Sequence, residues 1–249
     1  MTRIAEAKDR IIVALDVSTT TEAIHLVEEL RGQVGMFKVG LELFMAAGRD
    51  IVKRIRSTGQ KVFLDLKFID NPSTMAKAVY QAAKLQPEFI SIHSSCGDKS
   101  MIAAIENKGC SKLLAITVLT ALTNEQSYKI HGGSPAEKVF HLALNAYNLG
   151  IDGIVCAPTA NEVGEVSLDM RMHGLIKVTP SIRPVWAKRN DQHRIATPYD
   201  AIKNGADYLV IGRPITDPPQ FVLRSPARAV ELIVEEINAA LSMHPRHLS

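Results

Sequence analysis

Short apolar runs alternate with amphipathic segments along the chain. The runs are typical of strands buried in a parallel sheet, and they cover Ile11–Leu15, Met36–Val39, Val62–Leu66, Phe89–His93, Leu113–Leu119, Gly153–Cys156, Leu175–Val178 and Tyr208–Ile211. The segments between them predict helices, over Thr21–Leu30, Leu41–Thr58, Thr74–Leu85, Lys99–Asn107, Pro135–Leu149, Asn161–Met172, Pro198–Asn204 and Ser225–Leu241.

This alternation predicts an α/β fold with eight strand–helix units. A (β/α)8 TIM barrel usually has about 250 residues, so the 249 residues suit one barrel that forms a single domain over 1–249. The competing fold is an open doubly wound sheet. That fold favours a glycine-rich turn after its first strand, where this chain has Asp16-Val17-Ser18-Thr19. The long basic connection Pro180–Thr197 is typical of a lid.

Composition and charge exclude several classes of partner. Hydrophobic residues make up 46% of the chain and charged residues 22%, which suits a globular core. The net charge is only +3 and the basic residues are scattered, so we expect no nucleic-acid partner. No apolar stretch has the length that a bilayer requires, so we expect no membrane association.

The cysteines and histidines predict neither disulfides nor a metal site. Cys96, Cys110 and Cys156 lack C-x-x-C spacing, and no signal peptide is visible, so we expect reduced thiols in a cytoplasmic protein. Cys156 is expected to be a small buried hydrophobe. The histidines form no H-x-H or H-E-x-x-H motif, which argues against a zinc site.

Charged residues follow three consecutive predicted strands. Alternate side chains of a strand share one face, so we expect Asp65 and Lys67 to point the same way. Asp16 and Lys38 end the two preceding strands. Carboxyl ends of barrel strands meet at one mouth, where these folds carry their chemistry. An isolated Asp-x-Lys is more often a structural ion pair. Burying four charges without a function costs several kcal/mol, however, so a functional site is favoured.

A second cluster predicts phosphate binding. Gly212-Arg213-Pro214 follows the eighth strand and suits the start of a short helix, while Arg183 follows the seventh strand. Loops after these two strands often bind phosphate in barrels. The alternative is a plain helix start with a surface arginine. We expect a phosphorylated small-molecule substrate. His93 is typical of a hydrogen-bonded core residue, and Trp186 could either stack on a base or exclude solvent.

Together the motifs resemble the orotidine 5′-phosphate decarboxylase family. They occur in family order, as Ala14-Leu15-Asp16, Phe37-Lys38-Val39-Gly40, Asp65-x-Lys67-x-x-Asp70 with Thr74, Leu119-Thr120, Thr179-Pro180 with Ile182-Arg183-Pro184, Asp191-Gln192 and Ile211-Gly212-Arg213-Pro214-Ile215. The D-x-K-x-x-D motif alone also occurs in relatives such as 3-keto-gulonate-6-phosphate decarboxylase. Those metal-dependent relatives carry a glutamate where this chain has Lys38, a cation that would repel magnesium.

The resemblance implies conversion of orotidine 5′-phosphate to uridine 5′-phosphate without metal or cofactor. Asp65 would lie against the substrate carboxylate, and Lys67 would protonate C6 as carbon dioxide leaves. Lys38 would also pair the central carboxylates, and Asp70 would complete the Asp65–Lys67 pair of the neighbouring subunit. The residues themselves agree with this chemistry. Flanking anions favour the charged form of Lys67, and two carboxylates in one pocket repel each other until carbon dioxide leaves.

The same resemblance implies binding roles and a homodimer. Asp16 and Lys38 would hold the ribose hydroxyls, and Thr120 would contact the pyrimidine. Asp70 and Thr74 would reach into the active site of the partner subunit. The phosphate would be bound by Arg183, Gln192, Gly212 and Arg213.

Some positions depart from the family pattern, and two other functions stay open. Asn71 replaces an apolar residue near the expected subunit contact, and Ser181 stands where the family favours glycine, so its backbone must adopt angles that suit glycine. Ser73 and the segment after His93 also differ. The alternatives are a metal-dependent sugar-phosphate decarboxylase or aldolase, which Lys38 opposes, and an inactive nucleotide-phosphate binding protein, which would lack Lys67 or Asp65.

Overall fold

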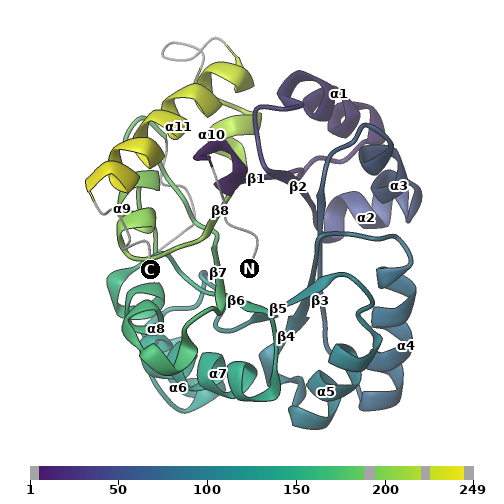
Figure 1. The fold of residues 1–249 in the computed structure, drawn as a ribbon, viewed down its shortest axis with the longest axis vertical. Coiled ribbons are helices and arrows are strands. Elements are labelled where there is room, and N and C mark those ends of the chain that lie inside the picture. Colours follow the sequence, from purple (N-terminus) through teal and green to yellow (C-terminus); the bar gives the residue numbers. More distant parts are fainter. Residues whose placement is uncertain (1–5, 188–193, 220–224, 244–249) are drawn as a thin grey trace.

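Eight parallel strands close into a barrel in the order β1 to β8 (Figure 1). The structure is a computed structural model, and it describes residues 6–187, 194–219 and 225–243. The first and last strands close the barrel, since Ile12 is paired with Met36 of β2 on one side and with Val210 of β8 on the other. The strands are β1 Ile11–Ala14, β2 Met36–Val39, β3 Val62–Phe68, β4 Phe89–His93, β5 Lys112–Ile116, β6 Gly153–Val155, β7 Ile176–Thr179 and β8 Tyr208–Ile211.

Helices surround the barrel on its outside (Figure 1). The α-helices are α1 Thr20–Leu30, α2 Leu41–Ala47, α3 Asp50–Ser57, α4 Pro72–Ala83, α5 Asp98–Asn107, α6 Asn124–His131, α7 Pro135–Leu149, α8 Glu165–Leu168, α9 Pro198–Lys203, α10 Arg213–Thr216 and α11 Pro226–Met243. Shorter turns are η1 Lys8–Arg10, η2 Ser94–Cys96, the π-helical η3 Ala160–Gly164 and η4 Met170–Met172. Within the described part of the chain, no helix combines the length and apolarity that crossing a membrane requires.

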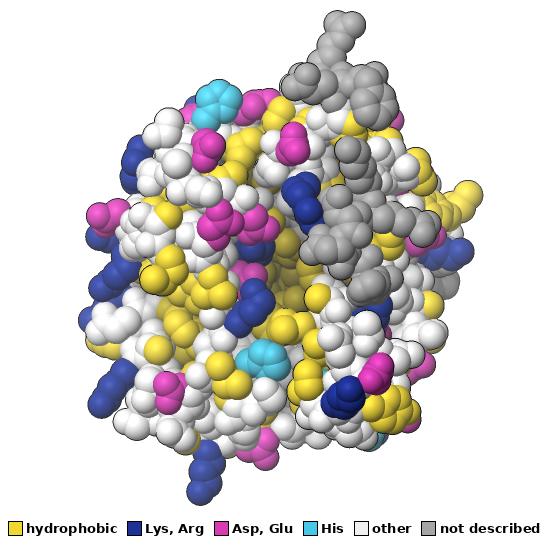
Figure 2. All heavy atoms as spheres, turned by 180° about the vertical axis from the view of Figure 1, so that it is seen from behind, with side chains coloured by type: hydrophobic (Ala, Val, Ile, Leu, Met, Phe, Trp, Pro, Cys, Tyr) yellow, Lys and Arg dark blue, Asp and Glu magenta, His cyan; other side chains and the backbone are white. Residues whose placement is uncertain are grey.

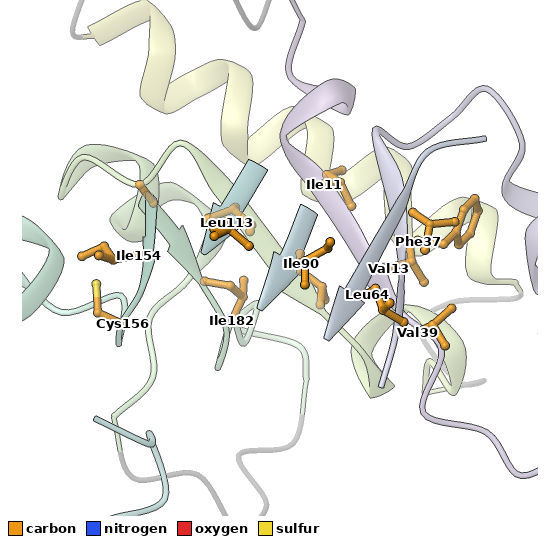
Figure 3. Close-up of a cluster of buried hydrophobic side chains, with 14 of the residues drawn as sticks. Ile11, Val13, Phe37, Val39, Leu64, Ile90, Leu113, Ile154, Cys156 and Ile182 are labelled. Carbon is orange, nitrogen blue, oxygen red and sulfur yellow. The ribbon is translucent and has the colours of Figure 1, made fainter. Parts of the chain in front are cut away.

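The strands are buried on both faces, which explains why they read as continuous apolar runs. Ile11 and Val13 point toward the helices and join an outer core with Phe37 and Leu64 (Figure 3). Ile12 points the other way, into an inner core that fills the barrel. In the inner core, the ring of Phe89 lies edge-on to the rings of Phe63 and Tyr208, with centroid distances of 5.9 Å and 5.3 Å. The predicted (β/α)8 barrel is therefore confirmed.

Two predicted helices are interrupted, and one observed helix was missed. Leu41–Thr58 divides into α2 and α3 because Gly48, with φ 62°, caps α2. Asn161–Met172 divides into η3, α8 and η4. α6 was not predicted because it has little apolar periodicity; Thr123 starts it through a capping box with Gln126.

Strand β3 is longer and less regular than predicted. It continues to Phe68, and its pairing with β4 shifts register between Leu64 and Phe68. Lys67 lies inside this irregularity, with a left-handed φ of 51°. A lysine rarely adopts this conformation. The bulge therefore sets the direction of the side chains at the carboxyl end of β3.

Candidate active site

The carboxyl ends of the strands surround a cavity of about 550 Å³. Seen from the side opposite to Figure 1, the molecule is hollowed near its centre, with acidic and basic side chains around hydrophobic ones (Figure 2). Most of the predicted site residues line this cavity, namely Asp16, Lys38, Asp65, Lys67, Thr120, Arg183, Gly212 and Arg213.

A larger groove of about 1030 Å³ lies among the loops that precede β3, β4 and β5. Glu88, one of its lining residues, forms ion pairs with Lys61, which also lines the groove, and with Lys112. It contains none of the residues that follow the strands. Barrel enzymes carry their chemistry at the carboxyl ends of the strands, so the smaller cavity is the candidate active site.

Alternating charges form a continuous chain along one wall of the cavity. Lys38 Nζ lies 3.0 Å from Asp16 Oδ1 and 3.6 Å from Asp65 Oδ2. Lys67 Nζ donates a hydrogen bond of 2.8 Å to the same Asp65 oxygen. Asp65 and Lys38 are buried, with 6% and 8% of their surface exposed. The four charges that sequence predicted to converge therefore form one connected group.

Asp65 is ionised despite its burial. Desolvation favours the protonated form, but Lys38, Lys67 and the hydrogen bonds from Lys67 and Ser91 outweigh it and hold the pKa of Asp65 below its usual range. A permanent carboxylate thus faces the cavity beside the ammonium of Lys67.

Ser91 is a site residue that sequence reasoning missed. Its buried hydroxyl donates to Asp65 Oδ1 at 2.8 Å and accepts from the backbone N–H of Lys67, also at 2.8 Å. One hydroxyl therefore holds the carboxylate and the left-handed backbone of the neighbouring lysine. The signal in the sequence was a single small polar residue inside the apolar run of β4, but nothing there shows that it faces Asp65.

Gly40 allows the lysine of β2 to reach its position. A Cβ atom at Gly40 would lie 2.9 Å from Lys38 Nζ and 3.4 Å from Asp16 Oδ1. Real Cβ atoms almost never approach other atoms so closely. A side chain at this position would therefore require the ammonium of Lys38 to shift.

The part of the cavity wall that follows β7 and β8 carries the two arginines. Arg183 is 7% exposed, and its backbone N–H donates to Ala196 O at 2.8 Å. Arg213 begins α10 directly after β8. Ser181 lines the cavity and has φ 63°, so the expectation that its backbone adopts glycine-like angles is confirmed. Its hydroxyl oxygen is buried without a hydrogen-bond partner among the described residues.

Some predicted site residues lie outside the cavity. Asp70 and Thr74 are exposed and are not among its lining residues. Asp70 Oδ1 accepts the N–H of Asn71, the N-cap residue of α4. Gln192 lies outside the described residues. Within one chain, Asp70 and Thr74 therefore do not complete the site.

Three other singled-out residues have mainly packing surroundings. His93 Nδ1 lies 2.7 Å from Ser95 Oγ, and burial, His131 and Lys67 lower the pKa of His93. Trp186 packs against the outer core and is not among the residues that line the cavity. Cys156 borders the cavity, and burial raises the pKa of its thiol. In the described ranges, no group of three His, Cys, Asp or Glu side chains could hold a metal ion.

Fold and site together define an enzyme of the (β/α)8-barrel class, in which a carboxylate–lysine chain and a pair of arginines line one pocket. The chain belongs to the orotidine 5′-phosphate decarboxylase / HUMPS family, whose model matches residues 9–222. Orotidine 5′-phosphate decarboxylase of Geobacter sulfurreducens is 41% identical over 244 residues, covering 94% of this chain and 98% of the relative. That of Gloeothece citriformis is 41% identical over 238 residues, covering 92% and 97%.

Solved structures agree with this family. The crystal structure of orotidine 5′-phosphate decarboxylase from Lactobacillus acidophilus matches with a TM-score of 0.77 at 32% identity, covering 92% of this chain and 98% of that one. The enzyme of the same name from Pyrococcus horikoshii matches with a TM-score of 0.73 at 22% identity and supports the fold alone.

Proposed function

We propose that the protein decarboxylates orotidine 5′-phosphate to uridine 5′-phosphate, the last step of UMP biosynthesis. The observation that carries this proposal is the buried Lys38–Asp65 pair, joined to the partly exposed Lys67 at the cavity. Membership of the family and the names of the relatives support it.

In the proposed reaction, the bond between C6 and the carboxylate carbon breaks and its electron pair stays on C6. Carbon dioxide leaves, and a proton from the Lys67 ammonium goes to C6. Asp65 lies against the departing carboxylate. Its negative charge therefore raises the free energy of the bound substrate but not that of the product, which has lost this carboxylate. Fixed charges supply the stabilisation here, because they require no reorganisation during the reaction.

The remaining cavity residues bind the nucleotide in this proposal. Asp16 and Lys38 hold the ribose hydroxyls, and Thr120 contacts the pyrimidine. Arg213 and Gly212, after β8, bind the phosphate together with Arg183 and Gln192. A guanidinium suits this role because it presents paired N–H donors to phosphate oxygens.

We further propose a homodimer in which Asp70 and Thr74 enter the site of the partner subunit. Their exposure outside their own cavity supports this arrangement. Ile69, the residue before Asp70, is an exposed apolar side chain directly after β3, with 57% of its surface exposed. The single-domain organisation over 1–249 and a cytoplasmic location, which the unpaired cysteines favour, belong to the same proposal.

The metal-dependent relative is not favoured. A magnesium ion between the carboxylates of β1 and β3 would meet the ammonium of Lys38, which lies between them. The test is to follow the loss of orotidine 5′-phosphate absorbance with purified protein in excess EDTA. We expect full activity. Activity that vanishes in EDTA and returns with magnesium would instead assign the chain to the metal-dependent branch.

A further inference from the structure

A buried ion pair lies behind the wall of the cavity formed by the loops after β5, β6 and β7. Glu162 belongs to η3 and is 3% exposed, and Arg194 lies near the end of the connection between β7 and α9. Arg194 Nε is 3.3 Å from Glu162 Oε1, and the arginine side chain is 14% exposed. Neither residue lines the cavity.

Arg194 also binds the backbone that leads into the cavity. Its Nη2 donates to Leu119 O at 2.8 Å and to Val118 O at 3.4 Å. Both residues follow the end of β5, line the cavity and immediately precede Thr120. The guanidinium thus holds a segment that extends beyond the barrel strand.

The same pair is linked to the two neighbouring segments. Glu162 Oε2 accepts the N–H of Ala157 at 3.4 Å, next to the cavity residue Cys156. Two residues after Arg194, Ala196 pairs with Ile182 and accepts the N–H of Arg183. Three separate parts of the wall therefore meet at one ion pair.

This ion pair is not expected to contribute much to the stability of the fold. Burial raises the pKa of Glu162, although Arg194 opposes the shift. Keeping this carboxylate ionised in the interior therefore costs free energy. Arg194 Nε and Nη1 have no hydrogen-bond partner in the described part of the chain, so the contact with Glu162 is ionic without a well-aligned hydrogen bond. Well-packed apolar residues often replace such a pair with no loss of stability.

We infer that Glu162 and Arg194 are positioning residues, which hold the loops after β5, β6 and β7 in the arrangement that receives the nucleotide. This inference rests on the proposed function. The opposite wall is held separately, by the charges of Asp16, Lys38, Asp65 and Lys67. Loss of the ion pair therefore weakens binding of substrate and product while proton transfer from Lys67 continues.

The test measures kcat and KM for orotidine 5′-phosphate, the Kd for UMP by calorimetry, and the melting temperature. The variants are Glu162→Gln, Arg194→Lys and the double variant Glu162→Leu with Arg194→Met. Arg194→Lys keeps the charge and preserves the fold, but it lacks the fork that reaches both carbonyls. The double variant removes both charges and restores an apolar interior. Lys108→Met is the control, because Lys108 forms a half-buried ion pair with Asp152 beside the amino ends of the strands.

We expect KM and the Kd for UMP to rise about tenfold in all three variants, within the range of coupling through positioning groups, while kcat changes much less. The double variant should regain the melting temperature of the wild type but not its KM. The control should lose thermal stability and keep its KM.

Three results would overturn the inference. The first is a double variant that regains both KM and melting temperature, which means a purely structural pair. The second is an unchanged KM in Arg194→Lys and in the double variant. The third is a loss confined to kcat. A wild-type protein that binds neither UMP nor substrate would contradict the proposed function itself. If the wild type binds both and the variants keep its KM and Kd, only the positioning role of Glu162 and Arg194 is contradicted.

Discussion

At the scale of single residues, one serine hydroxyl serves two parts of the active site. The Ser91 hydroxyl donates a hydrogen bond to Asp65 and accepts one from the backbone N–H of Lys67. Removing it leaves the N–H of Lys67 without its partner, and an unsatisfied buried group costs about 1–3 kcal/mol. The left-handed lysine and the ionised aspartate therefore depend on a residue that has no charge of its own.

We accordingly predict that Ser91→Ala lowers kcat more than Ser94→Ala does, whereas the two substitutions have similar effects on thermal stability. Ser94→Ala is the matched control, because Ser94 is the same residue type as Ser91 and is also buried. Its hydroxyl donates to Ile116 O and does not contact Asp65 or Lys67. Steady-state assays and melting curves compare the two. Equal effects of the two substitutions on kcat would contradict a specific role for Ser91.

Lys67→Ala should abolish turnover while UMP still binds. Lys67 is the ammonium placed against Asp65 at the open side of the cavity, and losing a general acid alone lowers the rate by about 10²–10⁴-fold. Calorimetry with UMP checks that the pocket persists. A variant that retains more than a tenth of the wild-type rate would remove Lys67 from the proposed role.

Ser181→Gly should stabilise the protein by about 1 kcal/mol, because a left-handed backbone strains a residue that has a Cβ. Chemical denaturation measures the free energy of unfolding. Ser181→Ala separates the two causes, since it removes the buried hydroxyl and keeps the strain. If the alanine variant gains as much as the glycine variant, backbone strain at Ser181 is not the cause.

At the scale of elements, the sequence predicted the strands well because each is buried on both faces. It also predicted that Asp65 and Lys67 meet, and they do. Regular alternation along β3 does not by itself explain this contact, however. The register of β3 shifts beside β4, and the backbone of Lys67 leaves the extended conformation. A bulge depends on the neighbouring strand, so local sequence alone does not reveal it.

The partners of long-range contacts were missed for the same reason. Glu162 and Arg194 belong to different strand–helix units, and their contact exists only once the barrel has closed. Asp16, Lys38, Arg183 and Arg213 were found because each lies at the carboxyl end of a strand or a few residues after it. The fold brings all such positions to one mouth.

For the element that joins β8 to α10, we predict that Arg213→Ala mainly weakens recognition of the phosphate. A charge-assisted contact of this kind contributes roughly 1.5–3 kcal/mol. The loss in kcat/KM should be large for orotidine 5′-phosphate and small for orotidine, which lacks the phosphate. Equal losses for both substrates would mean that Arg213 does not contact the phosphate.

At the scale of the whole molecule, the proposed dimer makes each active site depend on two chains. Lys67→Ala and Asp70→Asn should each be nearly inactive alone. In a hybrid dimer, one site carries both substitutions and the other carries neither. Random mixing makes half of the dimers hybrid, so activity should return to about one quarter of wild type.

This complementation needs proof that subunits exchange. Differently tagged chains that co-purify after mixing provide it. If exchange is demonstrated and activity stays absent, Asp70 acts within its own chain.

The closure of the barrel by its first and last strands also affects how the chain is made. Ile12 of β1 pairs with Val210 of β8, so the second partner of β1 is synthesised about 200 residues later. At about 5–20 residues per second, β1 waits roughly 10–40 s on the ribosome with one edge open. Open apolar edges invite pairing with other chains. A stalled or truncated chain that ends before Tyr208 is therefore a target for chaperones and proteases, and not a partly active enzyme.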